Sequence, residues 1–285
     1  ILFKSYMNKI LIISSFSPSL IGFRGKLIES LQNNNIEVHV AVPGLDNNIR
    51  IKEQLESNDV ILHELKLSRN GFNPFLDLIT LLQLFKIMKK LNPHYVLAYT
   101  IKPVIYGMIA AKLSRIPKSF PLITGLGYAF TGRAEGIRGL LRKLLQKMYQ
   151  LALRCANKIF FQNPDDKALF ETLNIIDESN KALVINGSGV DLDYYSVVPL
   201  PEHTSFLMIA RLLGDKGVRE YVEAAKQVQK DYPNVTYSLV GWIDKNPNAI
   251  DQTELDEWIS EGTISFLGKL EDVRPAIATT SVYVL

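Results

Sequence analysis

Residues 94–124 have the sequence HYVLAYTIKPVIYGMIAAKLSRIPKSFPLIT. An apolar run at 94–99 is followed by a helix-length segment at 103–113 and by a second apolar run at 120–124. Pro103 falls in the first turn of the predicted helix, where proline is tolerated because the amide hydrogen that it lacks would have no partner. This strand–helix–strand unit, with apolar strands, predicts a parallel sheet covered on both faces.

The same alternation extends over the first two thirds of the chain, and a pause follows it. Residues 194–204 contain Pro199 and Pro201 and show no periodicity, which predicts a linker. Before the pause, the pattern predicts further strands at 9–13, 36–42, 60–65, 158–162 and 182–186, and further helices at 21–32, 74–91, 137–156 and 164–173.

After the pause the alternation returns. It predicts strands at 206–210, 235–240, 263–267 and 282–285, and helices at 218–229, 252–260 and 272–278. We therefore predict an α/β protein with two doubly wound parallel-sheet domains, at residues 7–190 and 205–285, joined by a linker at 191–204. Met7 is taken as the native start, and the second domain is expected to be incomplete at Leu285.

Composition narrows the class of protein. The chain has 285 residues, of which 47% are apolar and 21% charged, values that are ordinary for a globular protein of one large or two medium domains. The single cysteine, Cys155, excludes an internal disulfide framework and fits a reducing cytoplasm. Residues 119–132 carry no charge but are too short to span a bilayer.

The charge is divided unevenly between the two halves. Residues 1–190 carry 24 basic and 14 acidic side chains, whereas residues 191–285 carry 8 and 15. Between Lys66 and Lys158 there are 16 basic residues and only two acidic ones, Asp77 and Glu135. This asymmetry indicates that the first domain faces an anionic partner.

A first candidate site is the segment 211–217, RLLGDKG, between a predicted strand and a predicted helix. In open parallel sheets, ligands bind beyond the carboxyl ends of the strands, where Arg211 falls. Lys216 and Gly217 fall at the start of the helix, where free amide groups and the helix dipole favour an anion. The segment therefore predicts a diphosphate clamp; the alternative is a solvated loop with two ordinary surface cations.

Glycines gather after the predicted strands. Neither pair spaced Gly-x-Gly continues into a dinucleotide fingerprint, because Phe130 or Leu192 occupies the third position, so a nicotinamide cofactor has little support. Each glycine alone could serve only a turn. Their shared position after strands favours a cleft lined by Gly22, Gly25, Gly125, Gly127, Gly187, Gly189 and Gly241.

The segment 137–154 combines leucines with Lys143, Lys147 and Arg154. It fits either a core helix with a solvated basic face or a helix at a membrane surface, and the surrounding positive charge favours the membrane. No recognisable reader motif supports a nucleic-acid partner. Peripheral association of the basic first domain with an anionic membrane is therefore expected.

Metal ligation has no support in the sequence. The four histidines are scattered along the chain, and three of them fall within predicted strands. Asp191 and Asp193 imitate the Asp-x-Asp metal motif of some sugar transferases. Without other clustered carboxylates, this pair is better explained as a turn and helix cap.

Five segments together resemble bacterial glycosyltransferases of family 4, which have the GT-B fold of two facing Rossmann-like domains. Among these, the chain resembles transferases that add a hexose or N-acetylhexosamine to a sugar linked to undecaprenyl diphosphate. The segments are 99–107 (YTIKPVIYG), 122–132 (LITGLGYAFTG), 160–166 (FFQNPDD), 186–191 (NGSGVD) and 210–217 (ARLLGDKG).

The resemblance implies an enzyme of the bacterial cytoplasm, at the inner face of the plasma membrane, that uses a UDP-sugar with retention and without a bound metal or other cofactor. It implies that Arg211 and Lys216 hold the donor diphosphate. It places Gly22 and Arg24 near the sugar and phosphates. It places five residues on the acceptor side of the cleft: Thr100, Lys102, Gly125, Gly127 and Tyr128.

Two alternatives remain open. One is a GT-B sugar-nucleotide epimerase, although the histidines are poorly placed for one. The other is an inactive nucleotide-sugar-binding remnant, because family members continue past residues 282–285 into a helix with a glutamate pair that contacts the donor. The resemblance therefore implies that residues 1–285 alone are catalytically inactive or nearly so.

Overall fold

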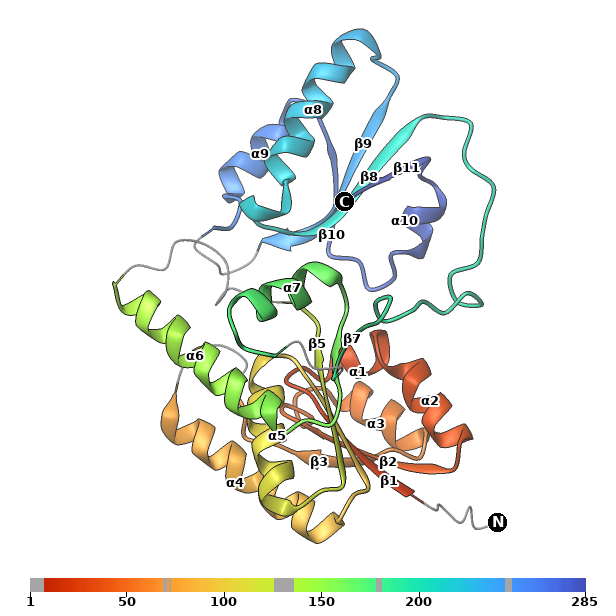
Figure 1. Cartoon of the computed structure of the whole chain (residues 1–285). Coiled ribbons are helices and arrows are strands. Elements are labelled where there is room, and N and C mark those ends of the chain that lie inside the picture. The colour runs from red at the N-terminus through yellow and green to blue at the C-terminus, as the bar shows by residue number, and fades with distance from the viewer. Residues whose placement is uncertain (1–7, 69–70, 72, 126–135, 178–180, 244–247) are drawn as a thin grey trace. The chain divides into compact units, whose positions relative to one another are not determined.

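The chain folds into two compact units, Ile1–Val190 and Asp191–Leu285, in a computed structural model that describes residues 8–68, 71, 73–125, 136–177, 181–243 and 248–285 (Figure 1). Both units are α/β and both sheets are parallel. The predicted fold class is thus confirmed.

The first unit is a seven-stranded parallel sheet of order β3-β2-β1-β4-β5-β6-β7. The strand order reverses between β1 and β4, which pair in the register Ile10↔Tyr95. The strands are β1 (Asn8–Ile13), β2 (Ile36–Val42), β3 (Ile61–Glu64), β4 (Tyr95–Tyr99), β5 (Lys118–Ile123), β6 (Ile159–Phe161) and β7 (Ala182–Val184).

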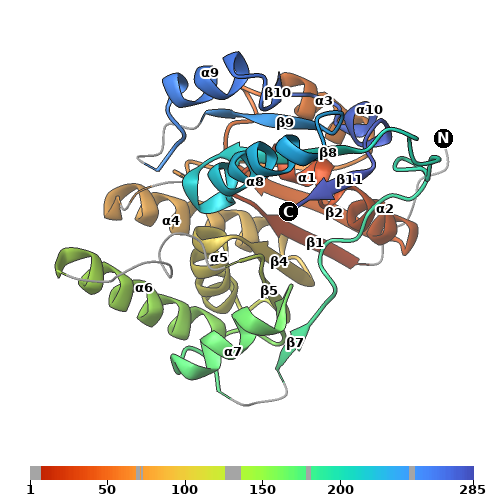
Figure 2. The same ribbon diagram turned by 90° about the horizontal axis from the view of Figure 1, so that it is seen from above.

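Helices cover both faces of this sheet (Figure 2). One buried cluster joins alternate strand residues, such as Ile12 and Val40, to the first helices, and a second joins Leu11 and Ile13 to the later ones. The first layer contains α1 (Pro18–Gly22), α2 (Gly25–Asn33) and α3 (Ile49–Ser57). The second contains α4 (Pro74–Leu91), α5 (Ile101–Ser114), α6 (Gly136–Arg154) and α7 (Pro164–Thr172).

Two helices begin with the same local signal. The side chain of Asn73 accepts a hydrogen bond from the amide of Leu76 at 3.2 Å, and Pro74 opens α4. The side chain of Asn163 accepts one from the amide of Asp166 at 2.7 Å, and Pro164 opens α7. An asparagine cap followed by proline satisfies one free amide and removes another, so both helices start where the sequence predicts.

The prediction of one continuous helix at residues 21–32 is wrong. The structure divides it into α1 and α2, with a break at Phe23 and Arg24. Glycines flank the break, and glycine lowers helix stability because its backbone has the most freedom to lose. The break turns Arg24 inward.

Helix α3 was not predicted, since only Ile51 and Leu55 mark its buried side.

The second unit has a parallel sheet of order β10-β9-β8-β11. Helices α8 and α9 pack on one face through a cluster that includes Tyr221, Leu255 and Trp258. Because crossovers in parallel sheets are right-handed, the reversal of order before β11 places α10 on the opposite face. The elements are β8 (Ser205–Leu212), a 3₁₀ turn (Gly214–Lys216), α8 (Val218–Asp231), β9 (Thr236–Ile243), α9 (Gln252–Ser260), β10 (Ser265–Gly268), α10 (Arg274–Ala278) and β11 (Val282–Val284).

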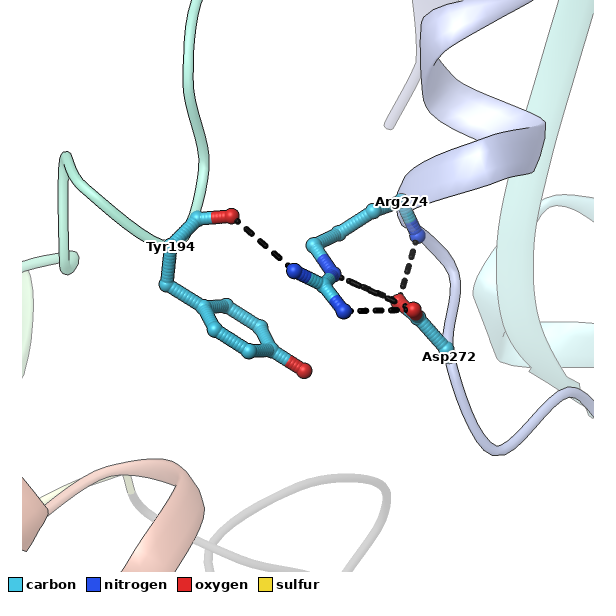
Figure 3. Close-up of polar contacts among 3 residues, drawn as sticks. All are labelled: Tyr194, Asp272 and Arg274. Carbon is cyan, nitrogen blue, oxygen red and sulfur yellow. Dashed lines mark hydrogen bonds and ion pairs between the residues drawn. The ribbon is translucent and has the colours of Figure 1, made fainter.

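The predicted linker has no helix or strand, and its first part is attached to the second unit (Figure 3). The guanidinium of Arg274 lies 3.7 Å from the ring centroid of Tyr194 and donates to the Tyr194 carbonyl at 3.4 Å. Asp272 holds the same guanidinium through Nε and Nη2, at 2.9 and 2.7 Å. The carboxylate of Asp191 accepts from the amides of Asp193 and Tyr194, so the predicted turn is confirmed, but no helix follows it within residues 191–204.

We expect Arg274→Ala to release this part of the linker without unfolding the unit. Amide hydrogens of residues 192–198 should exchange several-fold faster, because the ring of Tyr194 loses its cation–π and hydrogen-bond partner. Arg274→Lys keeps the charge but not the planar stacking, so it should be intermediate. Hydrogen exchange measured by mass spectrometry tests this, and equal protection in all three proteins would contradict it.

Three polar side chains form a chain across β2 and β3. Nδ1 of His39 lies 3.0 Å from Nε2 of His63, and Nε2 of His39 lies 2.7 Å from a carboxylate oxygen of Glu37. Burial lowers the pKa of His63, and the nearby His39 and Lys90 lower it further. The neutral form of His63 is therefore favoured in the folded protein.

This lowered pKa predicts an acid-sensitive first unit. As the pH falls, the unfolded chain, with an ordinary histidine pKa of about 6.5, binds a proton before the folded chain does. The contribution of His63 to stability is therefore complete above about pH 6.5 and is lost as the pH falls below it. Urea midpoints at several pH values should show a smaller loss for His63→Gln than for the wild type, whereas the exposed control His203→Gln should behave like the wild type. Parallel curves for His63→Gln and the wild type would contradict the prediction.

Candidate functional site

The first unit gathers polar side chains at the carboxyl edge of its sheet, where β1 and β4 separate. Ser15 follows β1 and Thr100 follows β4, and their hydroxyl oxygens lie 2.8 Å apart. Thr100 has φ +70°, a conformation that costs a non-glycine residue energy and persists where surrounding contacts enforce it. Ligands of doubly wound sheets bind at such a reversal of strand order, so this edge is the candidate site of the first unit.

Arg24 is buried at this edge, with 4% of its surface exposed. Its Nη1 donates to the hydroxyl of Ser188 at 2.8 Å and to the carbonyl of Phe23 at 3.0 Å, and its Cζ lies 4.8 Å from the ring centroid of Tyr99. Gln162 also donates to Ser188, at 2.9 Å. The resulting group joins segments that are as many as 164 residues apart in sequence.

The charge on Arg24 is incompletely satisfied. Burial lowers the pKa of its guanidinium, yet arginine keeps its proton in proteins. Its buried Nε has no hydrogen-bond partner, and no carboxylate pairs with the side chain within the described ranges. A buried guanidinium with a remaining donor favours an anionic ligand, and phosphate matches its geometry. The prediction that Arg24 lies near donor phosphates has this support.

Tyr99 contributes a second polar group beside Arg24. Its hydroxyl lies 2.9 Å from the hydroxyl of Ser19. Burial raises the pKa of Tyr99, so the phenol stays protonated and can donate a hydrogen bond. Tyr99, Ser188 and Gln162 were not predicted as site residues, although each lies in a segment that carries the family resemblance.

Lys102, predicted on the acceptor side, forms a buried ion pair. Its ammonium group donates to Asp77 at 2.7 Å, and both side chains are largely buried. The pair joins the first turns of α4 and α5, and Asp77 raises the pKa of the neighbouring Tyr106 in addition to the effect of burial. The ion pair with Asp77 therefore gives Lys102 a structural role.

The predicted glycines differ in what requires them. Gly125, Gly187 and Gly189 have φ values of +137°, +71° and +74°, which favour glycine whatever the space around them. At Gly22 and Gly25 an added Cβ would meet no atom within 4 Å, so the chain itself leaves open space there. Gly127 and Tyr128 lie outside the described residues.

Gly241 is required by strand packing. A Cβ at this position would clash with the carbonyl oxygen of Ala210, its register partner on β8. Next to it, Trp242 is partly exposed at the carboxyl end of β9, and the ammonium group of Lys269 lies 5.3 Å from its ring centroid. The register also places Trp242 opposite Arg211.

The predicted diphosphate clamp lies at the carboxyl end of β8. Arg211 is the penultimate residue of that strand, and Lys216 ends the 3₁₀ turn that follows. Gly217 has φ +74° and precedes α8, whose first turn has no side-chain cap. Uncapped amides at a helix start suit a phosphate group, and Lys216 directly precedes this start while Arg211 lies at the end of the preceding strand.

The loop that carries Lys216 is attached to the segment after β9. The amide of Gly214 donates to the carbonyl of Asn248 at 2.8 Å, and the amide of Ile250 donates to the carbonyl of Leu212 at 3.0 Å. A Cβ at Gly214 would lie 2.9 Å from Oδ1 of Asn248. These contacts hold the loop close to the strand end.

Among the described residues, no group of three histidine, cysteine or acidic side chains is arranged to hold a metal ion.

More than half of the chain matches the model of a known protein family. Residues 9–163 match the family model described as "Glycosyl transferase 4-like". The chain belongs to this family. Its two Rossmann-like units agree with the GT-B fold of the family's structural relatives. The resemblance found in the sequence is thereby confirmed.

Two relatives have curated names that specify sugars linked to diphospho-undecaprenol. The N,N'-diacetylbacillosaminyl-diphospho-undecaprenol alpha-1,3-N-acetylgalactosaminyltransferase of Campylobacter jejuni is 28% identical over 96% of this chain and 73% of its own length. The UDP-Gal:alpha-D-GlcNAc-diphosphoundecaprenol alpha-1,3-galactosyltransferase of Escherichia coli is 24% identical over 58% of this chain and 44% of its own length.

Solved structures support the fold. A glycosyltransferase from Rickettsia africae superposes with a TM-score of 0.71 at 19% identity and covers 97% of this chain and 72% of its own. A UDP-GlcNAc 2-epimerase from Neisseria meningitidis superposes with a TM-score of 0.62 at 13% identity, over 96% of this chain and 76% of its own. The fold is therefore shared by transferases and epimerases, so it does not choose between the two activities.

Proposed function

We propose that the protein is a retaining glycosyltransferase that moves a hexose or N-acetylhexosamine from a UDP-sugar to a sugar linked to undecaprenyl diphosphate. The observation that carries the proposal is the family membership, together with relatives whose names specify diphosphoundecaprenol-linked acceptors. The name of the Escherichia coli relative also specifies a UDP-sugar donor. The product would enter the assembly of a surface glycan or of a glycoprotein glycan.

Arg211 and Lys216 would hold the diphosphate of the donor at the start of α8. As the bond between the sugar and the diphosphate breaks, negative charge grows on the departing UDP. Fixed positive charge and oriented amides stabilise that charge most strongly in the transition state, which makes their role electrostatic. No proton transfer by these residues is needed, and the proposed chemistry requires no resident metal or other cofactor.

Retention requires the acceptor hydroxyl to enter on the face from which UDP leaves. We infer a same-face displacement in which the leaving phosphate accepts the proton of the acceptor hydroxyl. Arg24, with its remaining Nε donor, would contact phosphate or sugar oxygens from the first unit. Thr100, Gly125 and the nearby Tyr99 would line the acceptor side. Lys102 would act there mainly by fixing the first turn of α5.

An acceptor with a polyprenyl chain is reached at a membrane surface. Within the described residues, no helix is both long and apolar enough to cross a bilayer. We propose peripheral association of the basic first unit with the anionic inner face of the plasma membrane, supported by its excess of basic side chains.

Binding of UDP provides the first test. Isothermal titration of residues 1–285 should show that UDP binds more tightly than ADP or GDP, and that Arg211→Ala weakens it. An epimerase would share this nucleotide but would act without an acceptor. If UDP binds no better than the other nucleotides, or if Arg211→Ala binds it normally, the assignment of the donor site is wrong.

A further inference from the structure

Helix α6 exposes leucines on the side that faces away from the sheet. Tyr149, Ala152 and Leu153 are buried in the core of the first unit. On the other side, Leu140, Leu144 and Leu151 are 70%, 43% and 51% exposed. Residues at intervals of four and seven share one side of a helix, so these leucines form a single row.

Helix α4 has a comparable row near its start. Its buried side consists of Asp77, Thr80, Leu84 and Met88. Phe75, Leu78 and Leu82 are 75%, 53% and 50% exposed, at intervals of three and four residues. Both helices belong to one layer, with α5 between them (Figure 2). We call six of the exposed apolar residues of the two helices the α4–α6 face: Phe75, Leu78, Leu82, Leu140, Leu144 and Leu151.

The exposed charged side chains of these two helices are all basic. Exposed lysines lie among the apolar residues, at Lys86 and Lys89 on α4 and at Lys143 and Lys147 on α6. The sequence of α6 contains no acidic residue, and the only one of α4 is Asp77, which is buried and paired with Lys102. The exposed surface of the two helices thus combines large apolar side chains with positive charge that no exposed acidic residue of the same helices offsets.

We propose that the α4–α6 face docks on an anionic lipid bilayer and inserts its leucines and Phe75 between the lipid headgroups. The inference deepens the proposed function, because it names the surface by which the protein would meet its membrane. Charge complementarity decides the occupant. A second copy of the chain would bring like charges together, and nucleic acid would leave the apolar row without a favourable partner.

Vesicle co-sedimentation of residues 1–285 tests the proposal. Phosphatidylcholine vesicles with about one third phosphatidylglycerol should bind the protein, and vesicles without it should bind much less. Leu144→Gln with Leu151→Gln should lower the partition coefficient about tenfold or more, since both side chains are already exposed and their loss should not disturb folding. Lys143→Gln with Lys147→Gln should lower it comparably and reduce its dependence on salt.

A matched control and a second readout keep the test decisive. Ile49 is exposed on α3, in the other helix layer, so Ile49→Gln should bind like the wild type. In the Leu144→Trp variant, brominated lipid should quench the fluorescence of the introduced indole, because both natural tryptophans, Trp242 and Trp258, lie in the second unit. Unchanged partition of the leucine-to-glutamine variant, or no quenching of the introduced indole, would overturn the proposal.

Two other outcomes would identify a different occupant. A concentration-dependent dimer of the wild type that Leu144→Gln with Leu151→Gln abolishes would assign the face to a second copy. Binding to duplex nucleic acid that exceeds vesicle binding would also refute the proposal. The vesicles contain neither nucleotide nor sugar acceptor, so this test can fail while glycosyl transfer succeeds, and the reverse.

Discussion

Arg211→Ala should lower kcat/KM for the UDP-sugar about ten- to 150-fold, and Lys216→Ala should have an effect of similar size. A hydrogen bond to a charged group contributes about 1.5–3 kcal/mol, and each 1.4 kcal/mol corresponds to about tenfold. The loss should appear largely in kcat, because charge on the diphosphate is greatest when UDP departs. Steady-state kinetics of the full-length protein that contains these residues provides the measurement.

Arg219→Ala is the matched control for this prediction. Arg219 lies on α8 close to the same loop, but its guanidinium is held by Glu254 through two hydrogen bonds of 2.6 and 2.8 Å. Its removal should leave kcat/KM within about twofold of the wild type, since an exposed ion pair contributes little. The clamp is refuted if Arg211→Ala and Lys216→Ala keep normal kinetics, or if the control loses as much activity as they do.

Lys102→Met should destabilise the first unit by about 3–5 kcal/mol. Removal of the lysine leaves Asp77 buried and charged without its partner, and breaking a buried ion pair on one side typically costs this much. Asp77→Asn combined with Lys102→Met should recover part of the loss, because no isolated charge then remains buried. Urea unfolding followed by circular dichroism measures both variants.

Lys112→Met, at an exposed position in the last turn of α5, is the control and should unfold near the wild-type midpoint. If Lys102→Met also unfolds there, the contact with Asp77 does not stabilise the unit. The ammonium group of Lys102 would then be available to an acceptor, as the family resemblance implied.

The fold could be predicted largely from local signals. Asn73 with Pro74, and Asn163 with Pro164, set the starts of α4 and α7 through a cap and a missing amide hydrogen. The apolar strands predicted a parallel sheet, because only strands covered on both faces lose the polar alternation. The break between α1 and α2 escaped prediction, because apolar periodicity continues through Phe23 and only the flanking glycines mark the break.

From residue spacing alone, the candidate site could be predicted only where it is local in sequence, whereas Arg24, Thr100 and Gly125 were implied by the family resemblance. Arg211, Lys216 and Gly217 lie within seven residues, so the geometry of a strand end and a helix start was enough to propose them together. The contact of Arg24 with Ser188 and the pair of Lys102 with Asp77 depend on how distant helices and loops pack. Close approach of β8 to β9, which explains Gly241, is likewise a property of the folded sheet.

Transfer of a labelled sugar tests the central claim most directly. The full-length protein would be incubated with a panel of labelled UDP-sugars, with and without an acceptor sugar on undecaprenyl diphosphate. The amount of label extracted into organic solvent would then be measured. The account predicts that at least one UDP-sugar gives an extractable product, only with the acceptor present, and that Arg211→Ala gives far less. Conversion of the UDP-sugar to an isomer without acceptor, or no extractable product from any donor, would contradict it.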